Sequence, residues 1–312
     1  MDVSLKTNSS PLVSVIIPNY NHAKYLDERI QSILNQTFQN FEIIILDDKS
    51  NDDSLEVIDK YRDAPHVSHI IVNDVNTGKP CMQWKKGITI AKGVFIWIAE
   101  SDDTCSPFFL EKLLALHHSK NTVLTFARSQ RIDDAGRLYF TYDPGISEGV
   151  WNGKDFIANY LGKRCYIVNA SSVLFRKSFF AGISEDYLNL QGSADWLFWI
   201  ELCKQGDVGF CGEVLNYMRY HESNATIINS LKGINYFADK KINDYLYSQR
   251  LISRFTYKQN IHYKLLEIKS RKFETEQVRR DLVNLWGGNS LGYKVRSILS
   301  MVLNKLDCLL WS

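Results

Sequence analysis

The sequence has no apolar run long enough to cross a membrane as a helix. A spanning helix needs about 20 predominantly apolar residues, and the nearest stretch, residues 298–311, is interrupted by polar side chains. The N-terminal stretch has an acidic second residue, and its apolar run is broken early by Pro18, which is not typical of a secretion signal. We therefore expect a protein that is neither secreted nor embedded in a bilayer.

Cysteine motifs are also absent. The 6 cysteines are scattered, without a CxxC pair or a Cys/His spacing that would hold zinc. Reduced thiols in a cytoplasmic protein are the simplest interpretation. A glycine-rich phosphate loop is missing as well, because Pro18-Asn19-Tyr20-Asn21 follows the first apolar run.

Composition indicates a folded globular protein, and charge is distributed unevenly along it. Hydrophobic residues make up 45% of the chain and charged residues 23%, values that disfavour disordered and fibrous classes. The net charge is +2, but residues 231–312 hold 15 lysine and arginine residues against 7 aspartate and glutamate residues. This basic region predicts an anionic partner, either a membrane surface or a polyanion.

The first hundred residues alternate between short apolar runs and segments with helical periodicity. The runs predict buried strands at 13–17, 41–46, 69–73 and 94–99, and the segments between them predict helices at 23–35, 54–61 and 84–91. Such alternation is typical of a parallel α/β sheet with right-handed crossovers. Ligands of these sheets bind at the carboxyl ends of the strands.

The second half of the chain predicts a mixed set of elements followed by helices. A hairpin turning at 133–136, a helix at 155–161, a strand at 171–176, a helix at 195–205 and a strand at 210–220 are expected. Beyond His221 the pattern is helical. Residues 293–310 place an apolar stripe beside basic side chains, which favours membrane contact or, equally, core packing or dimerisation.

Two adjacent carboxylates follow the strand at 94–99. Asp102 and Asp103 supply hard oxygen ligands that suit Mg²⁺ or Mn²⁺ bridged to a diphosphate. The competing interpretation is that one of them caps a helix opening at 104–107. Taken alone, the pattern favours neither.

Other polar residues follow the strands at the same predicted edge. Asp48 follows the second strand and could accept a hydrogen bond from a nucleobase, and Tyr20 offers a ring for stacking or for simple packing. Asn76 and Lys79 belong to a turn whose cation could reach phosphate or remain solvated.

The candidates for proton transfer and for a further metal ligand lie late in the chain. Asp195 precedes an apolar helix, where it could act as a general base or interact with the helix dipole. His221 follows a strand and could bind the ion or phosphate, although such a histidine is more often a surface residue.

The ordered set of motifs resembles the inverting family 2 glycosyltransferases with the GT-A fold, over roughly residues 12–225. The matching segments are 13–21, 32–37, 41–50, 76–78, 91–93 with Asp102-Asp103, 194–196 and 219–221. The resemblance implies a Rossmann-like, mostly parallel sheet and a hexosyl transfer from a nucleotide diphosphate sugar, most commonly a UDP-sugar, by single displacement with inversion.

The resemblance also implies roles for individual residues. Pro18 and Tyr20 would line the nucleoside pocket, Asp48 would bind the base, and Asp102 would contact ribose or metal. Asn21, Asn76 and Lys79 are further candidates for binding the donor. Asp103 would coordinate Mn²⁺ or Mg²⁺, with His221 as a second ligand, and Asp195 would be the catalytic base. The chain departs from the family pattern at Ala194 and at 84–86, which weakens the assignments around the donor phosphates.

The predicted organisation has three parts. Residues 1–11 form a tail, residues 12–225 the transferase domain with a nucleotide-binding half (12–103) and an acceptor half (104–225), and residues 226–312 a basic helical extension. We expect a non-processive enzyme of bacterial envelope or surface glycan synthesis, since the QxxRW signature of processive synthases is absent. Its acceptor would be a glycan or a lipid-linked glycan, and it would not bind nucleic acid.

The expected location is the cytoplasm, including the inner face of the cell membrane. Two other functions remain alternatives. A sugar nucleotidyltransferase would share the fold but should have the missing glycine-rich loop, and a non-catalytic nucleotide-sugar-binding protein need not retain Asp48, Asp103 and Asp195 together.

Overall fold

The computed structural model describes residues 10–221 and 224–288. The described residues divide into two compact units, one of residues 10–189 and 194–221 and the other of residues 190–193 and 224–288. Within the described residues, the first unit ends at His221.

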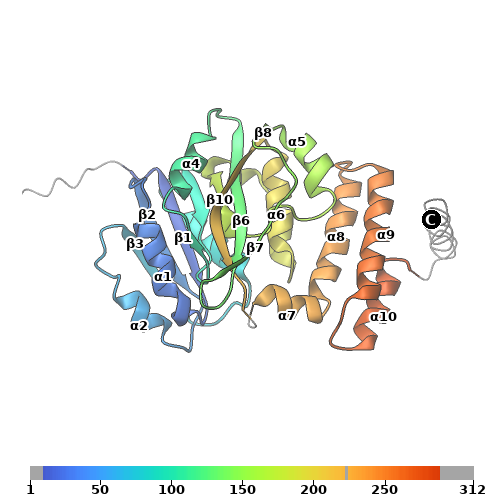
Figure 1. Cartoon of the computed structure of the whole chain (residues 1–312), viewed down its shortest axis with the longest axis horizontal. Helices are drawn as coiled ribbons and strands as arrows, with labels where there is room; N and C mark the ends of the chain where they lie inside the picture. The colour runs from blue at the N-terminus through green and yellow to red at the C-terminus, as the bar shows by residue number, and fades with distance from the viewer. Residues whose placement is uncertain (1–9, 222–223, 289–312) are drawn as a thin grey trace, which may run out of the picture. The chain divides into compact units, whose positions relative to one another are not determined.

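A sheet of ten strands, counted over the described residues, organises the first unit (Figure 1). The strands are β1 (Val13–Asn19), β2 (Phe41–Asp47), β3 (Val67–Val72), β4 (Phe95–Ile98), β5 (Thr104–Cys105), β6 (Thr122–Ile132), β7 (Leu138–Thr141), β8 (Gly149–Trp151), β9 (Val173–Arg176) and β10 (Asp207–Arg219). Their order is β3-β2-β1-β4-β9-β6-β10-β5, with β7 on β6 and β8 on β10.

The sheet is mixed but mostly parallel, as predicted. Strand β1 runs parallel to β2 and β4, β2 to β3, and β10 to β6, while β9 is antiparallel to its neighbours β4 and β6. All seven residues of β1 and of β2 are buried, as expected for parallel strands covered on both faces. The carboxyl ends of β1, β2 and β4 therefore meet at one edge of the sheet.

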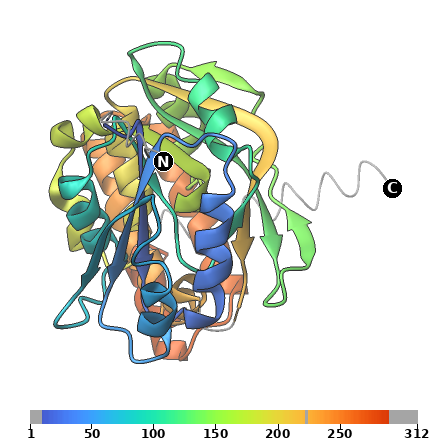
Figure 2. The same cartoon turned by 90° about the vertical axis from the view of Figure 1, so that its left-hand side faces the viewer.

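Helices cover both faces of this sheet. They are α1 (Ala23–Leu34), α2 (Ser54–Asp59), α3 (Pro80–Ile90), α4 (Phe109–Ala115), α5 (Gly153–Phe156), which continues into a π-helical turn (Ile157–Leu161), and α6 (Ala194–Cys203). Short 3₁₀ helices cover Ala170–Ser172, Lys177–Gly182 and Glu185–Asn189. Figure 2 shows the helices on either side of the strands.

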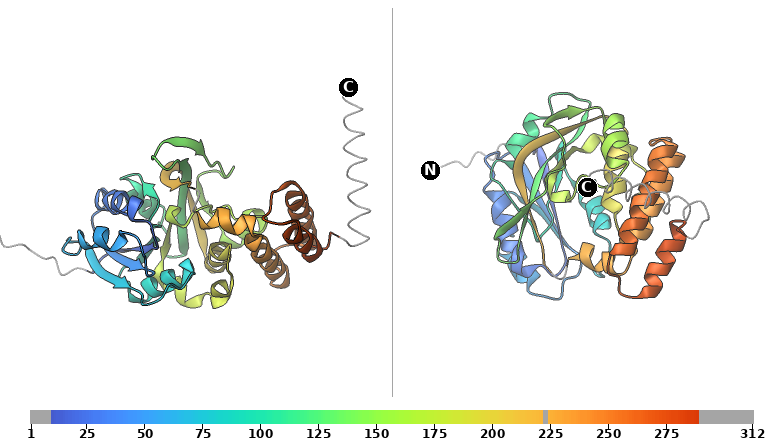
Figure 3. Two further views of the ribbon diagram at one scale, coloured as in Figure 1. Left: turned by 90° about the horizontal axis from the view of Figure 1, so that it is seen from below. Right: turned by 45° about the vertical axis from the view of Figure 1, so that its right-hand side comes forward.

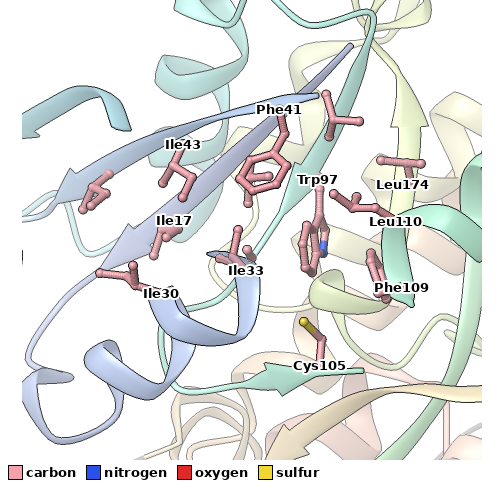
Figure 4. Packing of buried hydrophobic residues seen from close by; sticks show 14 of the residues in the cluster. Ile17, Ile30, Ile33, Phe41, Ile43, Trp97, Cys105, Phe109, Leu110 and Leu174 are labelled. Atoms are coloured by element: carbon pink, nitrogen blue, oxygen red, sulfur yellow. The ribbon is translucent and has the colours of Figure 1, made fainter. Parts of the chain in front are cut away.

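The alternating side chains of each strand divide between the two helical layers. On one face, side chains of α1 and α4 pack around Trp97, Ile17 and Leu174 in a single apolar cluster (Figure 4). On the other, Gly87 of α3 lies against Ile16, so closely that an added Cβ would stand 2.5 Å from Cγ2 of that residue. Close packing of this kind fixes the position of α3 on the sheet.

One local prediction is wrong. No helix opens at residues 104–107, because Thr104 and Cys105 form β5, an antiparallel partner of β10. Helix α4 begins later, at Phe109, and has no side-chain cap. Neither Asp102 nor Asp103 is therefore a helix cap, and the capping interpretation of these residues falls.

The described part of the second unit is helical, as predicted. Its helices are α7 (Ala225–Leu231), α8 (Ile234–Ser248), α9 (Arg254–Ser270) and α10 (Glu276–Leu285) (Figure 3). Tyr236, Leu265 and Trp286 belong to the apolar cluster that joins α8, α9 and α10. The amphipathic segment predicted at 293–310 lies outside the described residues. Within the described ranges, every helix is too short or too polar to cross a bilayer.

Candidate active site

Two strand ends are joined by polar side chains at the predicted edge of the sheet. Asn19 closes β1 opposite Asp47 of β2, and its Nδ2 donates to Oδ2 of Asp47 at 2.8 Å. The backbone N–H of Asp48 donates to the carbonyl oxygen of Asn19 at 2.8 Å. These bonds place Asp48 directly beside the turn that carries Tyr20 and Asn21.

Hydrogen-bond donors surround the carboxylate of Asp48. Asn73 Nδ2 and Gln83 Nε2 donate to Oδ1 at 2.7 and 2.8 Å, and Thr77 Oγ1 donates to Oδ2 at 2.7 Å. The backbone N–H of Thr77 approaches both oxygens, at 3.0 and 3.1 Å. Asp48 thus holds the 73–77 turn in place, and only 5% of its surface is exposed.

The remaining predicted donor-site residues are positioned by backbone contacts. Asn21 adopts a left-handed conformation (φ 56°) and its Oδ1 accepts from the N–H of Asn51 at 2.8 Å. The Asn76 side chain accepts from Gly78 N at 2.6 Å, and Lys79 Nζ donates to Leu188 O at 3.2 Å.

The two predicted residues of the nucleoside pocket differ in exposure. Tyr20 is 42% exposed, so its ring is available for stacking. Pro18 is different, because it lies buried within β1.

A histidine–aspartate cluster forms at the end of β4. Among the described residues, the ligand atoms of His22, Asp102 and His221 lie within 4.8 Å of one another. His221 Nε2 lies 3.0 Å from Asp102 Oδ2, and His22 Nδ1 lies 2.8 Å from Ser101 Oγ. The cluster therefore joins three segments that are far apart in the sequence.

Asp103 lies behind this cluster rather than in it. Its Oδ2 accepts from Ser171 Oγ at 2.6 Å and from Asn169 Nδ2 at 2.9 Å, and its Oδ1 accepts from the N–H of Arg219 at 3.0 Å. Asp103 is 1% exposed, whereas the Asp102 side chain is 14% exposed. The sequence assigns the metal to Asp103, but the structure brings Asp102 together with His221.

The adjacent carboxyl groups differ in protonation. Burial raises the pKa of Asp103 to about 7, and the neighbouring charge of Asp102 adds to this effect. Burial opposes ionisation of Asp102 too, but the hydrogen bond from His221 and the electrostatic interactions with both imidazoles outweigh it and lower the pKa of Asp102. Asp102 is therefore the carboxylate that keeps its charge beside the two imidazoles.

The donor set of the cluster fits a divalent ion. A carboxylate oxygen and two imidazole nitrogens form a mixed set, and nitrogen ligands favour Mn²⁺ over Mg²⁺, which prefers oxygen. Burial lowers the pKa of His22, so its ring is neutral and can donate a lone pair. His22 was not among the site residues predicted from the sequence. A histidine two residues after Tyr20 has no spacing to other ligand residues that would indicate a metal site.

Helix α3 links the acidic groups of the site. Gln83 donates to Asp48, and one residue later Trp84 Nε1 donates to Glu100 Oε1 at 3.0 Å. On the preceding turn, burial together with the charges of Asp195 and Glu100 raises the pKa of Cys81. Asp48 and Glu100 therefore both contact the amino-terminal half of α3, and the charge of Asp195 acts on the same part of this helix.

Asp195 is carried into this region by α6. It lies in the first turn of the helix, and the following residues Trp196 to Cys203 are all buried. The Trp84 ring packs against Phe198 and Trp199 of α6, with centroid separations of 5.7 and 5.9 Å. The apolar contact between α3 and α6 thus sets the position of Asp195 relative to Trp84.

Glu100 and Arg29 were also missed from the sequence. Burial and the charges of Asp102 and Asp103 raise the pKa of Glu100 to about 8, so it is largely protonated at neutral pH. Arg29 is fully buried in α1 with its guanidinium 4.9 Å from the centroid of Trp97. The charge of Arg29 lowers the pKa values of Glu100 and Asp103. The helical periodicity of the sequence places Arg29 next to the apolar stripe, but it does not distinguish Arg29 from other positions there.

The mixed, mostly parallel sheet flanked by helices is a GT-A-like fold. The family described as glycosyl transferase family 2 matches residues 14–189, more than half of the chain. The chain belongs to this family.

Individual relatives agree with this assignment. TuaG of Bacillus subtilis, named for teichuronic acid biosynthesis, is 31% identical over 120 residues, which are 38% of this chain and 47% of TuaG. The chain covers less than half the length of most of the curated relatives that it matches.

Two solved structures share the fold. S. aureus TarS 1-349 in complex with UDP-GlcNAc has a TM-score of 0.59 at 17% identity, over 89% of this chain and 73% of that one. The mannosyltransferase PcManGT of Pyrobaculum calidifontis, in complex with GDP-Man and Mn²⁺, has a TM-score of 0.54 at 13% identity, over 95% and 81%.

Proposed function

We propose that this glycosyltransferase moves a sugar from a UDP-sugar to a hydroxyl group of an envelope or surface glycan, with inversion and without processivity. The observation that carries the proposal is the grouping of Asp48, Asp102 and Asp195 around α3 and the β4 end. Transfer from such a donor needs a contact with the nucleoside, a group that neutralises the charge of the diphosphate, and a base that removes the proton of the acceptor hydroxyl. The three carboxylates supply one candidate for each role.

The nucleoside part of the donor would lie beside Asp48. Its carboxylate can accept from the imide N–H of uracil, and the bonds from Asn73, Thr77 and Gln83 hold it rigidly. Tyr20 is exposed next to it and offers an aromatic face to the base. The choice of uracil rests on this acceptor group, and the TarS complexes with UDP and UDP-GlcNAc support it.

The diphosphate would lie beside Asp102, His22 and His221, which we assign as ligands of Mn²⁺. When bound, the ion neutralises the charge that develops on the leaving group. The Mn²⁺ in the complex of PcManGT supports this choice of metal. Asp103 supports the ligands from behind, because it holds the backbone of Arg219 two residues before His221.

Asp195 would remove the proton from the acceptor hydroxyl. A carboxylate positioned on the attacking oxygen increases its nucleophilicity as the bond to the anomeric carbon forms. Attack from the side opposite the diphosphate inverts the configuration. Packing of α6 against Trp84 positions Asp195, and such positioning contributes much of the rate enhancement.

The glycan process is proposed from the relatives. TuaG is named for teichuronic acid biosynthesis, and the described residues hold no membrane-spanning helix. An enzyme working on lipid-linked glycans at the inner face of the cell membrane is consistent with both. Peripheral membrane contact or dimerisation through the helices beyond residue 221 remains part of this proposal.

The test is a donor panel with matched metal conditions. UDP-, GDP- and dTDP-sugars are incubated with the full chain, first with Mn²⁺ and then with EDTA, and release of each nucleoside diphosphate is measured. We expect Mn²⁺-dependent release from a UDP-sugar. Release of pyrophosphate from a nucleoside triphosphate and a sugar phosphate would instead indicate a nucleotidyltransferase, and binding without turnover a non-catalytic protein.

A further inference from the structure

Arg131 is held between two aromatic rings at the edge of the first unit. It lies in β6 directly opposite Phe140 of β7. Its guanidinium carbon is 5.5 Å from the ring centroid of Phe140 and 5.1 Å from that of Tyr220. Two cation–π contacts restrict the orientation of the guanidinium before any ligand binds.

This guanidinium has no carboxylate partner among residues 10–221 and 224–288. The two acids in the turn of the same hairpin, Asp133 and Asp134, bind other residues. Asp133 Oδ2 accepts from Arg137 Nε at 2.8 Å, and Asp134 accepts from Lys24 and Tyr25 of α1. The positive charge of Arg131 is thus oriented by its neighbours but not neutralised by them.

The rings around Arg131 form an exposed platform. Tyr139, Phe140 and Tyr220 are 51%, 49% and 44% exposed, and the centroids of Tyr139 and Tyr220 lie 6.4 Å apart. In the described part of the chain, strand β7 pairs with β6 alone, so its other edge is open. We call these three rings together with Arg131 the hairpin platform.

The platform is directly continuous with the proposed active site. Tyr220 precedes His221, whose Nε2 lies 3.0 Å from Asp102 Oδ2. The strand end is fixed by Arg219, which donates to Glu28 Oε2 at 2.6 Å and to the carbonyl oxygen of Asp102 at 2.9 Å. The contacts of Arg219 therefore fix the strand end that carries both Tyr220 of the platform and His221 of the proposed site.

We infer that the hairpin platform binds the acceptor, and that the acceptor is a glycan carrying phosphate or carboxylate groups. The planar guanidinium of Arg131 can hold such a group through two parallel hydrogen bonds. The exposed rings can pack against the apolar faces of sugar or polyol units on either side. A neutral glycan would leave the oriented charge without a partner. This inference rests on the proposed transferase function and assigns its acceptor class.

The test compares two single-charge variants of the same hairpin. Arg131→Gln removes the platform cation, and Arg137→Gln removes a cation that is 82% exposed and paired with Asp133. Binding of the full chain to poly(ribitol phosphate), polygalacturonate and neutral dextran is measured by titration calorimetry without donor. Comparison of the first two polymers distinguishes phosphate from carboxylate recognition.

We expect the wild type to bind at least one anionic polymer and not dextran. Arg131→Gln should weaken this binding about tenfold or more, as expected for loss of a charge-assisted hydrogen bond, while Arg137→Gln should change it by about twofold or less. Tyr139→Ser should weaken binding in the same direction. Equal loss in both arginine variants, equal binding of dextran, or no polymer binding by the wild type would overturn the assignment.

UDP affinity separates this inference from the proposed function. Arg131→Gln should bind UDP with Mn²⁺ as tightly as the wild type, because the platform contacts the acceptor. Unchanged UDP binding with unchanged polymer binding in Arg131→Gln rejects the platform and leaves the transferase assignment in place. If Arg131→Gln lowers UDP affinity instead, Arg131 belongs to the donor site and the inference is wrong.

Discussion

His221 Nε2 lies 3.0 Å from Asp102 Oδ2, although 119 positions separate the two residues in the chain. Asp102 follows β4, and His221 follows β10, which lies beyond β9 and β6 in the sheet order. The contact is made because Arg219 binds the 102–103 turn through its backbone and side chain. A ligand pair of this kind is a property of the whole sheet rather than of a local motif.

Asp102 and Asp103 should respond differently to the same substitution. Asp102→Asn removes the charged oxygen of the proposed ligand set and should weaken Mn²⁺ binding about tenfold or more. Loss of a residue that only hydrogen-bonds to a metal ligand already lowers metal affinity by about this factor. Asp103→Asn should keep more of the metal affinity but destabilise the fold by about 1–3 kcal/mol, because the amide retains only one acceptor oxygen for the three buried donors. Metal titration and urea unfolding of both variants measure the two effects. If Asp103→Asn loses the metal and Asp102→Asn keeps it, the assignment made from the sequence is correct instead.

Asp48 should control nucleotide affinity together with its supporting hydroxyl. Asp48→Asn should weaken UDP binding about tenfold or more, as for loss of a hydrogen bond to a charged group. Thr77→Val removes the 2.7 Å bond to Oδ2 and should have a smaller effect in the same direction. Thr89→Val is the matched control, because Thr89 Oγ1 donates to the backbone of its own helix. Titration with UDP would contradict this account if Thr77→Val and Thr89→Val behaved alike.

Asp195 should act on the chemical step rather than on donor binding. Asp195→Asn keeps the shape of the side chain but cannot accept a proton, so kcat for transfer should fall about 10²–10⁴-fold. The dissociation constant of UDP should stay close to the wild-type value. Steady-state kinetics with a UDP-sugar and calorimetry with UDP give both quantities. A variant that loses UDP affinity and keeps kcat would place Asp195 in the donor site.

His117 should make stability depend on pH. Burial lowers the pKa of His117 to about 4, and the charge of Arg176 contributes. A histidine in the unfolded chain takes up its proton near the ordinary imidazole pKa of 6.5, so between these two values the unfolded state holds more protons. The stabilising contribution is complete above about pH 6.5 and is lost as the pH falls toward 4, by at most about 3 kcal/mol.

His117→Gln should remove this dependence. Its free energy of unfolding should change less than that of the wild type between about pH 7 and about pH 4.5, a range that spans the ordinary imidazole pKa of 6.5. His118→Gln, at the exposed neighbouring position, should retain the wild-type slope. Urea unfolding across this range is the measurement, and parallel curves for the wild type and His117→Gln would refute the prediction.

The early strands and the parallel sheet were predictable because their signals are local. The apolar runs at 13–17 and 41–46 are continuous, and the structure confirms both strands, each extended by two residues or fewer. Helix α6 was predicted from the apolar run after Asp195 and is confirmed, with eight buried residues in succession. A segment that is apolar along its whole length can be placed only in the interior of the fold, so few alternative structures exist for it.

The arrangement of the site was less predictable because it depends on contacts between distant segments. The sequence could not show that Thr104 pairs with Tyr217 rather than opening a helix, nor that Ser171 and Asn169 would occupy Asp103. His22 and Glu100 were missed for the same reason, since their partners lie far away in the chain. The predicted roles of Asp48, Asp195 and His221 remain proposals.

Binding of UDP in the presence and absence of Mn²⁺ tests the central claim most directly, because the claim is that one ion beside Asp102 joins the diphosphate to the protein. The measurement is the dissociation constant of UDP for the wild type and for Asp102→Asn, with Mn²⁺ and then with EDTA. We predict that Mn²⁺ tightens UDP binding by the wild type and has no effect on the variant. Metal-independent binding by the wild type, or equal tightening in both proteins, would contradict the account.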